Sequence, residues 1–127
     1  MNYGYKKQLN ISFTEAVREV REELTQEGFG ILTEIDVKKT LEKKLGVAYG
    51  NYIILGACNP PFAYESLKAE KDIGLLLPCN IIIYEEGNQV FASAILPTVA
   101  MGMVDNPKLN RVARTVEEKL KKVIDNL

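Results

Sequence analysis

Two cysteines, each followed by an asparagine, are the residues of this sequence best suited to do chemistry. Cys58 precedes Asn59, and Cys79 precedes Asn80. If the strand that ends at Cys58 pairs antiparallel with the strand that begins at Cys79, both thiols lie at the same edge of the sheet. Twenty residues separate the two cysteines in sequence, so only the fold can bring them together. We therefore expect the candidate site at this edge.

Four interpretations of Cys58 and Cys79 are open at this point. Both can be small buried apolar residues, because free cysteine is among the most buried residue types. A disulfide between them would close a loop of 22 residues and add about 3 kcal/mol of stability, although a reducing compartment disfavours it. Cys58 can instead be a reactive thiol, because the helix N-terminus expected at Asn59-Pro60 would stabilise a thiolate. Finally, both thiolates can hold a soft metal ion, but two sulfurs need further ligands, such as Glu65 or a partner chain, to complete a tetrahedral zinc site.

Other polar residues extend the candidate site. Asn59 is a good helix N-cap, and its amide can also orient a ligand beside Cys58. Asn80 lies inside an apolar strand, where its amide needs hydrogen-bond partners. Glu34 and Asp36 are two residues apart at a strand end, a spacing that puts both carboxylates on one face. An N-cap at Asp36 and a solvated acid at Glu34 explain this pair more simply than acid–base chemistry does.

Several large side chains could surround a pocket at this site. Tyr49, Tyr52 and Tyr64 could form its rim, although tyrosines at strand starts usually pack with a solvated hydroxyl. Met101 and Met103 could line a cavity or a mobile segment, although methionine more often fills gaps in a core.

The composition excludes much of the familiar enzyme chemistry. The 127 residues include no histidine, so a Ser-His-Asp triad, a Cys-His dyad and a zinc site built on imidazole are excluded. A glycine-rich phosphate loop is absent, since Gly28-Phe29-Gly30 lacks the third glycine and precedes a strand. We therefore assign no catalytic residue, no metal and no cofactor, and we expect binding rather than catalysis.

The charge of the chain is unevenly distributed, although its net value is −1. Residues 1–48 are neutral overall, residues 49–105 carry a net charge of −4, and residues 106–127 carry +3. A duplex-binding domain normally has a strong basic excess, because its affinity comes from neutralising phosphates. We therefore expect no nucleic-acid partner, and we interpret the basic C-terminal segment as the solvated face of a helix.

Neither a membrane segment nor a targeting segment is expected. The start of the chain, Met1-Asn2-Tyr3-Gly4, lacks the apolar core of a signal peptide. The longest nearly apolar run, residues 73–84, is too short to cross about 30 Å of hydrocarbon. With only two cysteines, a disulfide scaffold is not expected either. These observations predict a cytoplasmic protein with reduced thiols and no membrane partner.

The pattern of apolar residues predicts the elements that position these side chains. Strands are expected over residues 5–11, 29–35, 52–58, 79–85 and 89–96. Helices are expected over residues 13–27, 37–45, 60–68 and 106–127, the last with the clearest helical period. A capping box at Ser12 and a glycine at Gly28 delimit the first helix, and Gly87-Asn88 predicts a tight hairpin. Thr98 to Asp105 is expected to be a simple connection.

This order of elements is typical of an α+β domain. We expect a single domain over residues 1–127, with a curved, mainly antiparallel five-stranded sheet, two short helical insertions and a long C-terminal helix across its concave face. The fourth strand, with Ile81, Ile82 and Ile83, lacks alternation, so both of its faces should be covered. The scarcity of charge over residues 73–84 predicts that a second copy hides this surface, and hence a homodimer.

Three motifs, in order along the chain, resemble a known family. Residues 28–37 read GFGILTEIDV, Cys58-Asn59-Pro60 follows, and residues 74–80 read GLLLPCN. Together they resemble the domain-of-unknown-function family numbered 302, and the resemblance covers nearly the whole chain. It implies a small bacterial or archaeal protein with a β-α-β(4)-α fold similar to one half of a TATA-binding protein. It implies no established activity, and similarity of fold does not carry DNA binding with it.

The function that the sequence favours is the non-catalytic binding of a small ligand. We expect a pocket between the curved sheet and the long helix, because polar and thiol groups gather there beside apolar walls. Its predicted ligand-binding residues are Cys58, Asn59, Cys79, Asn80 and Glu34. The alternatives are thiol redox or thiol-transfer chemistry by Cys58 and Cys79, and a purely structural or protein-interaction role.

Overall fold

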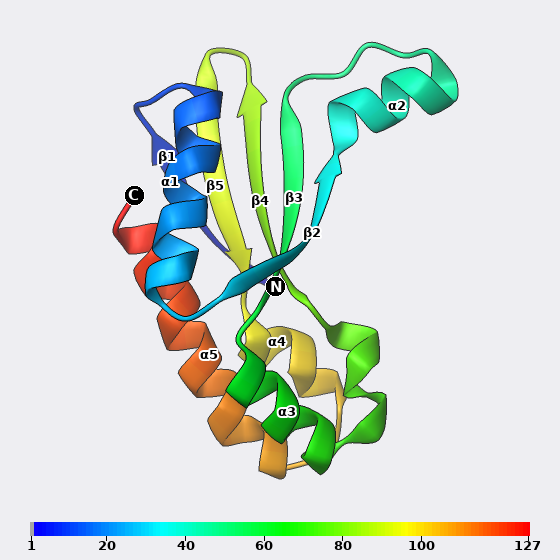
Figure 1. Ribbon diagram of the computed structural model, residues 1–127, viewed down its shortest axis with the longest axis vertical. Coiled ribbons are helices and arrows are strands. Elements are labelled where there is room, and N and C mark those ends of the chain that lie inside the picture. Colours follow the sequence, from blue (N-terminus) through cyan, green and yellow to red (C-terminus); the bar gives the residue numbers. More distant parts are fainter. Residues whose placement is uncertain (1) are drawn as a thin grey trace.

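The computed structural model describes residues 2–127, which form one antiparallel sheet with helices on one of its faces and at one of its ends (Figure 1). The strands are β1 (Gly4–Leu9), β2 (Gly30–Asp36), β3 (Tyr52–Cys58), β4 (Cys79–Glu86) and β5 (Gln89–Ile95). The helices are α1 (Phe13–Gln26), α2 (Val37–Leu45), α3 (Pro60–Ala69), α4 (Pro97–Ala100) and α5 (Lys108–Asp125). Two 3-10 helices, η1 (Lys71–Leu76) and η2 (Met101–Met103), complete the list. The predicted α+β fold with a long C-terminal helix is confirmed.

The sheet has the strand order β1-β5-β4-β3-β2, and all four neighbouring pairs are antiparallel. Helix α1 carries the chain from one edge of the sheet to the other, and β1 and β2 remain as the two edges. The predicted two-residue turn between β4 and β5 is confirmed, with Gly87 at a φ of 62° that favours glycine. The sheet is therefore open, with its centre at β4.

Helices α1 and α5 lie side by side on one face of the sheet and enclose the main core (Figure 1). The strands supply every second residue to this core, as strand geometry requires. From β5 these are Val90, Ala92 and Ala94, and from β4 they include Ile81 and Ile83; the helices contribute Ala16, Val20, Leu24, Val112, Val116, Leu120 and Val123.

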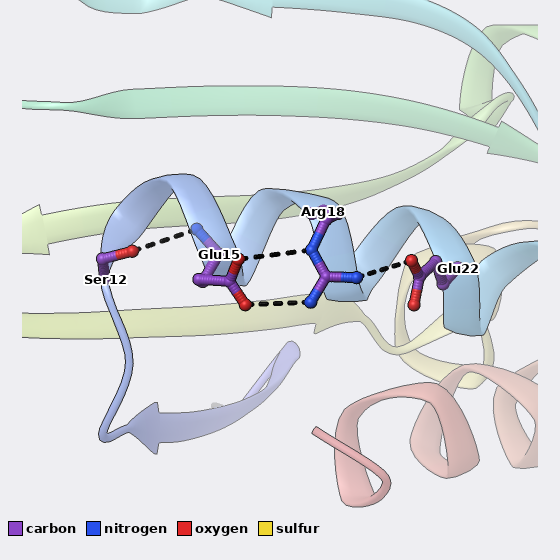
Figure 2. Close-up of polar contacts among 4 residues, drawn as sticks. All are labelled: Ser12, Glu15, Arg18 and Glu22. Carbon is purple, nitrogen blue, oxygen red and sulfur yellow. Dashed lines mark hydrogen bonds and ion pairs between the residues drawn. The ribbon is translucent and has the colours of Figure 1, made fainter.

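The start of α1 realises half of the predicted capping box (Figure 2). The Ser12 hydroxyl accepts a hydrogen bond of 3.1 Å from the main-chain N–H of Glu15. The Glu15 carboxylate does not reach back to Ser12 but pairs with Arg18 at 2.8 Å, and Arg18 also pairs with Glu22 at 2.6 Å. The helix is thus capped by the serine alone, while its exposed face carries a row of ion pairs.

The chain contains short helical segments that the pattern does not predict. The segment expected as a simple connection after Pro97 forms α4 and η2, and η1 precedes β4. These segments are at most six residues long, so they are too short to show a 3.6-residue period. Helix α5 begins at Lys108, two residues later than predicted, because the Asn106 side chain accepts from the Lys108 main-chain N–H at 3.0 Å. Within residues 2–127 no helix is long and apolar enough to cross a membrane.

The sheet face opposite α1 and α5 carries a second set of large side chains. We call it the open face. The sequence predicts that both faces of β4 are covered, but within residues 2–127 only one of them is. Ile81 and Ile83 are buried on the covered face. Ile82 and Tyr84 are half-buried on the open face. A row of stacked rings crosses this face, with centroids 5.4 Å apart from Tyr52 to Tyr84 and 5.3 Å apart from Tyr84 to Phe91.

Candidate functional site

A cavity of about 320 Å³ lies at the end of the sheet where β3 stops and β4 begins. The register pairs Ala57 of β3 with Cys79 of β4, so the predicted approach of the two cysteines at one sheet edge is confirmed. Cys58, Asn59 and Cys79 all line the cavity. The other walls come from α3 (Phe62, Ala63, Ser66, Leu67), from α5 (Val112, Ala113, Val116), and from Phe29, Leu32, Ala57, Leu77, Pro78 and Met101.

Helices α3 and α5 each present one face to this cavity. Ala63, Ser66 and Leu67 follow the i, i+3, i+4 spacing of a single helix face. Val112, Ala113 and Val116, at i, i+1 and i+4, also lie on one side of α5, against which α3 packs. Pro60 and Pro61 start α3 directly after β3, where the missing N–H groups cost no helical hydrogen bond. This abrupt start places α3 across the end of the sheet (Figure 1).

Asn59 connects two helices instead of capping one with its side chain. It occupies the N-cap position of α3, but its side chain makes no capping hydrogen bond. Its Nδ2 group instead donates to the main-chain oxygen of Glu27, at the C-terminal end of α1, over 3.1 Å. The main-chain oxygen of Asn59 accepts from the N–H groups of Phe62 and Ala63, so the first turn of α3 is still satisfied. The prediction of a side-chain cap at Asn59 is therefore wrong.

Each of the two polar side chains at the cavity, Asn59 and Ser66, donates one hydrogen bond to the main chain. Ser66 donates its hydroxyl to the main-chain oxygen of Phe62 at 2.8 Å, and the Asn59 amide donates as described. Among residues 2–127 no buried side-chain nitrogen or oxygen lacks a hydrogen-bond partner. No lysine, arginine, aspartate or glutamate lines the cavity. The cavity therefore has mainly apolar walls and no charged group.

The two thiols are free, and Cys79 is the more deeply buried of them. Cys79 is 8% exposed, whereas Cys58 is half-buried. Burial raises the pKa of the Cys79 thiol from its ordinary 9.0 to about 11, and the charge of a Cys58 thiolate acts in the same direction. Cys79 is therefore protonated at neutral pH, which makes it a poor nucleophile.

The metal interpretation of the two cysteines lacks ligands. Within residues 2–127 no three histidine, cysteine, aspartate or glutamate side chains are grouped so that they could hold a metal ion. Glu65, the carboxylate considered as a third ligand, forms an ion pair with Arg111 instead.

Asn80 and Glu34 lie outside the cavity. Neighbouring residues of a strand point to opposite faces, so the exposed Asn80 side chain points away from that of Cys79. Asn80 borders another hollow of about 270 Å³, which shares Cys79 and Met101 with the cavity. Glu34 forms an ion pair with Arg21 of α1. Asp36 caps α2, accepting from the main-chain N–H of Lys39 at 3.0 Å, as predicted.

The tyrosines and methionines considered as pocket residues fall into different places. Met101 is buried and lines the cavity, whereas Met103 is exposed. Tyr49 and Tyr52 border a groove on the open face, and Tyr64 is exposed on α3.

Four residues line the cavity without being predicted from the sequence, namely Phe62, Ser66, Ala113 and Val116. Their only signal in the sequence is that they lie on the core-facing side of a helix. The sequence pattern does not distinguish residues that line a cavity from residues that are packed in the core.

The sequence matches the model of the family described as "Domain of unknown function DUF302" over residues 5–127. Its fold is similar to a crystal structure of an uncharacterised conserved DUF302 protein from Bacillus stearothermophilus. The two chains share 29% sequence identity with a TM-score of 0.92, and the match covers 98% of each. No curated protein matches the sequence.

Proposed function

This chain belongs to the DUF302 family, as its motifs indicate, and within that family we propose that it is a non-catalytic module that binds a small, neutral, apolar molecule. The family description names no activity, so the proposal is based on the cavity beside Cys58, Asn59 and Cys79. The observation that carries it is a cavity with apolar walls and no charged residue.

The size of the cavity suits a small ligand. Its volume of about 320 Å³ is near the lower end of the range of about 300–1,000 Å³ that is typical of ligand pockets. Leu32 and Leu67 line the cavity and are also exposed. The apolar wall of the cavity therefore extends to the protein surface. A ligand can therefore enter with its apolar part first.

The chemistry of the walls favours a neutral ligand over an ionised one. Burying a carboxylate or an ammonium group without a partner is strongly unfavourable, and the cavity offers no opposite charge. The Ser66 hydroxyl and one N–H of the Asn59 amide are already bonded to main-chain oxygens. The thiols of Cys58 and Cys79 serve here as soft apolar wall atoms with weak S–H donors.

Thiol chemistry is a second candidate that one observation favours, namely that both cysteines line the same cavity. The raised pKa of Cys79 argues against that residue as an attacking thiolate. Within this candidate, Cys58 would be the attacking thiol and Cys79 the resolving one. A binding role needs neither thiol to ionise, so we prefer it.

The experiment compares two probes with the same chain length and different charge. Octanol should raise the apparent thermal unfolding temperature in a saturable way, because a ligand that binds only the native state stabilises it. Octanoate should have little effect, since its carboxylate finds no partner in the cavity. The proposal would be contradicted if octanoate stabilised the chain as strongly as octanol does. It would also be contradicted if neither compound stabilised the chain.

A pair of variants assigns the effect to the cavity. Ala63→Phe fills the space from α3 and should abolish the response to octanol. Lys68→Phe adds the same ring to an exposed position of the same helix and should leave the response unchanged. If both variants respond like the natural chain, octanol binds somewhere else.

A further inference from the structure

Helix α2 has an apolar row that the rest of residues 2–127 covers only in part. Val37, Leu41 and Leu45 follow each other at four-residue spacing, yet no residue of α2 is buried, and Leu45 is 69% exposed. Figure 1 shows that α2 projects from the β2 edge, away from the rest of the molecule. Val47 and Tyr49, in the segment after α2, are exposed too. We call residues 37–48 the arm; Tyr49, which follows the arm, lines the groove described next.

The open face of the same chain has a groove of about 730 Å³. Tyr52, Ile82 and Tyr84 contribute to it from the sheet, and Tyr3 borders it from the N-terminal segment. Tyr3 is 67% exposed. The groove therefore combines tyrosine and isoleucine side chains with polar residues, and residues 2–127 leave it uncovered.

The charges of the two surfaces are complementary. The arm has four lysines, Lys38, Lys39, Lys43 and Lys44, and a single acid, Glu42, so its net charge is +3. The charged residues that line the groove are Glu85, Glu86 and Lys6, with a net charge of −1. A basic helix is thus attracted to an acidic groove.

We propose that the arm of one copy docks in the groove of a second copy, and that the second copy returns the contact. A two-fold symmetric interface must be self-complementary, and one chain here has both halves of the contact. The arm does not fill its own groove, because Leu45 remains exposed. A symmetric dimer covers both arms and both grooves at once, and it would also cover the side of β4 that carries Ile82 and Tyr84.

The available surface is consistent with a stable dimer. Tyrosine has roughly 200 Å² of surface, so the exposed parts of Tyr3 (67%) and Tyr49 (48%) supply roughly 200 Å² of the ~800 Å² that each partner contributes to a standard interface. Leu45 and Val47 of the arm add two more exposed apolar side chains. The half-buried residues Ile82 and Tyr84 of the open face add to this surface.

Sedimentation equilibrium of the full chain at micromolar concentration tests this dimer. The natural chain should have the mass of two copies. Leu45→Asp should weaken the association about tenfold or more, because it buries an unpaired charge in the contact. Leu75→Asp is the matched control, since Leu75 is 87% exposed on η1 and lies outside both surfaces. A monomeric natural chain, or equal effects of the two variants, would overturn the proposal.

A charge exchange tests which surfaces meet. Lys43→Glu with Lys44→Glu should weaken the dimer, and so should Glu86→Lys on the rim of the groove. Combining all three substitutions should recover much of the lost affinity, because opposite charges face each other again. A combined variant that is weaker than either set alone would overturn the assignment of the arm to the groove.

Discussion

The side-chain amide of Asn59 donates a hydrogen bond of 3.1 Å to the main-chain oxygen of Glu27. This bond joins the start of α3 to the end of α1, two helices that are distant in sequence. Gly28 lies next to the bond with a φ of 86°, and a Cβ atom there would be 3.3 Å from the Asn59 Nδ2. Helix α3, which forms one wall of the cavity, is therefore joined by a hydrogen bond to the end of α1, a helix of the main core.

Replacing Asn59 by aspartate should break this connection. The Asn59→Asp variant loses the donor and places a carboxylate against the Glu27 oxygen, so we expect the free energy of unfolding to fall by about 1–3 kcal/mol at neutral pH. Urea unfolding measures this loss. Asn110→Asp, on an exposed position of α5, is the control with the same chemical change. The loss should shrink in acid, where a protonated aspartate can donate; equal stability of the two variants at neutral pH would contradict the role of the bond.

Gly56 is the strand position with the least space for a side chain. A Cβ atom there would lie 2.7 Å from the Cγ of Pro78 and would also overlap the hydroxyl of Thr33. Gly56→Ala should therefore destabilise the fold by roughly 1–3 kcal/mol, as overpacking does. Gly74→Ala is the control, because nothing lies within 4 Å of a Cβ atom at that position. Chemical denaturation of the two variants compares them directly, and an unchanged midpoint for Gly56→Ala would refute this account of the β2–β3 contact.

The cap of α1 depends on Ser12 and not on Glu15. Ser12→Ala should reduce the free energy of unfolding by about 1 kcal/mol, since an N-terminal N–H group loses its acceptor. Glu15→Ala should cost less, because the Glu15 carboxylate pairs with the exposed Arg18 and not with Ser12. Denaturant unfolding of both variants tests the order. The reverse order would indicate that a complete capping box forms in solution.

The buried thiol of Cys79 should make stability depend on alkaline pH. Its pKa is raised to about 11 in the folded chain from an ordinary 9.0, so the folded state holds the proton more tightly than the unfolded state. The stabilisation is complete below pH 9 and is lost as the pH rises towards 11, with a slope of at most about 1.4 kcal/mol per pH unit.

Comparison with Cys79→Ala separates this effect from the titration of lysines and tyrosines. The natural chain should lose more stability between pH 9 and 11 than the variant does, as measured by urea unfolding at each pH. Parallel pH profiles would show that Cys79 is not buried as described.

Much of the fold could be predicted because its signals are local. The cap at Ser12 and the glycines at Gly28, Gly46 and Gly87 delimit elements that the structure confirms, and all three glycines have positive φ values. The approach of Cys58 and Cys79 also follows from strand order, since antiparallel neighbours bring the end of one strand to the start of the next.

The rest of the site depends on packing between elements, which the sequence pattern does not encode. Ala113 and Phe62 meet at the cavity only because α3 and α5 cross there. Asn80 was assigned to the site by its proximity to Cys79 in sequence, although strand alternation puts the two side chains on opposite faces. The Asn59 side chain bonds to Glu27 instead of capping α3, a choice set by the position of α1.

The most direct test of the proposed binding role is a titration of the methyl-labelled chain with octanol, followed by NMR. The account predicts saturable shifts at the cavity methyls of Ala57, Ala113 and Val116, with little change at Ala92 and Ala94 in the core beneath the helices. Shifts that do not saturate, or that appear at Ile54 and Ile82 on the open face instead of at the cavity, would contradict it.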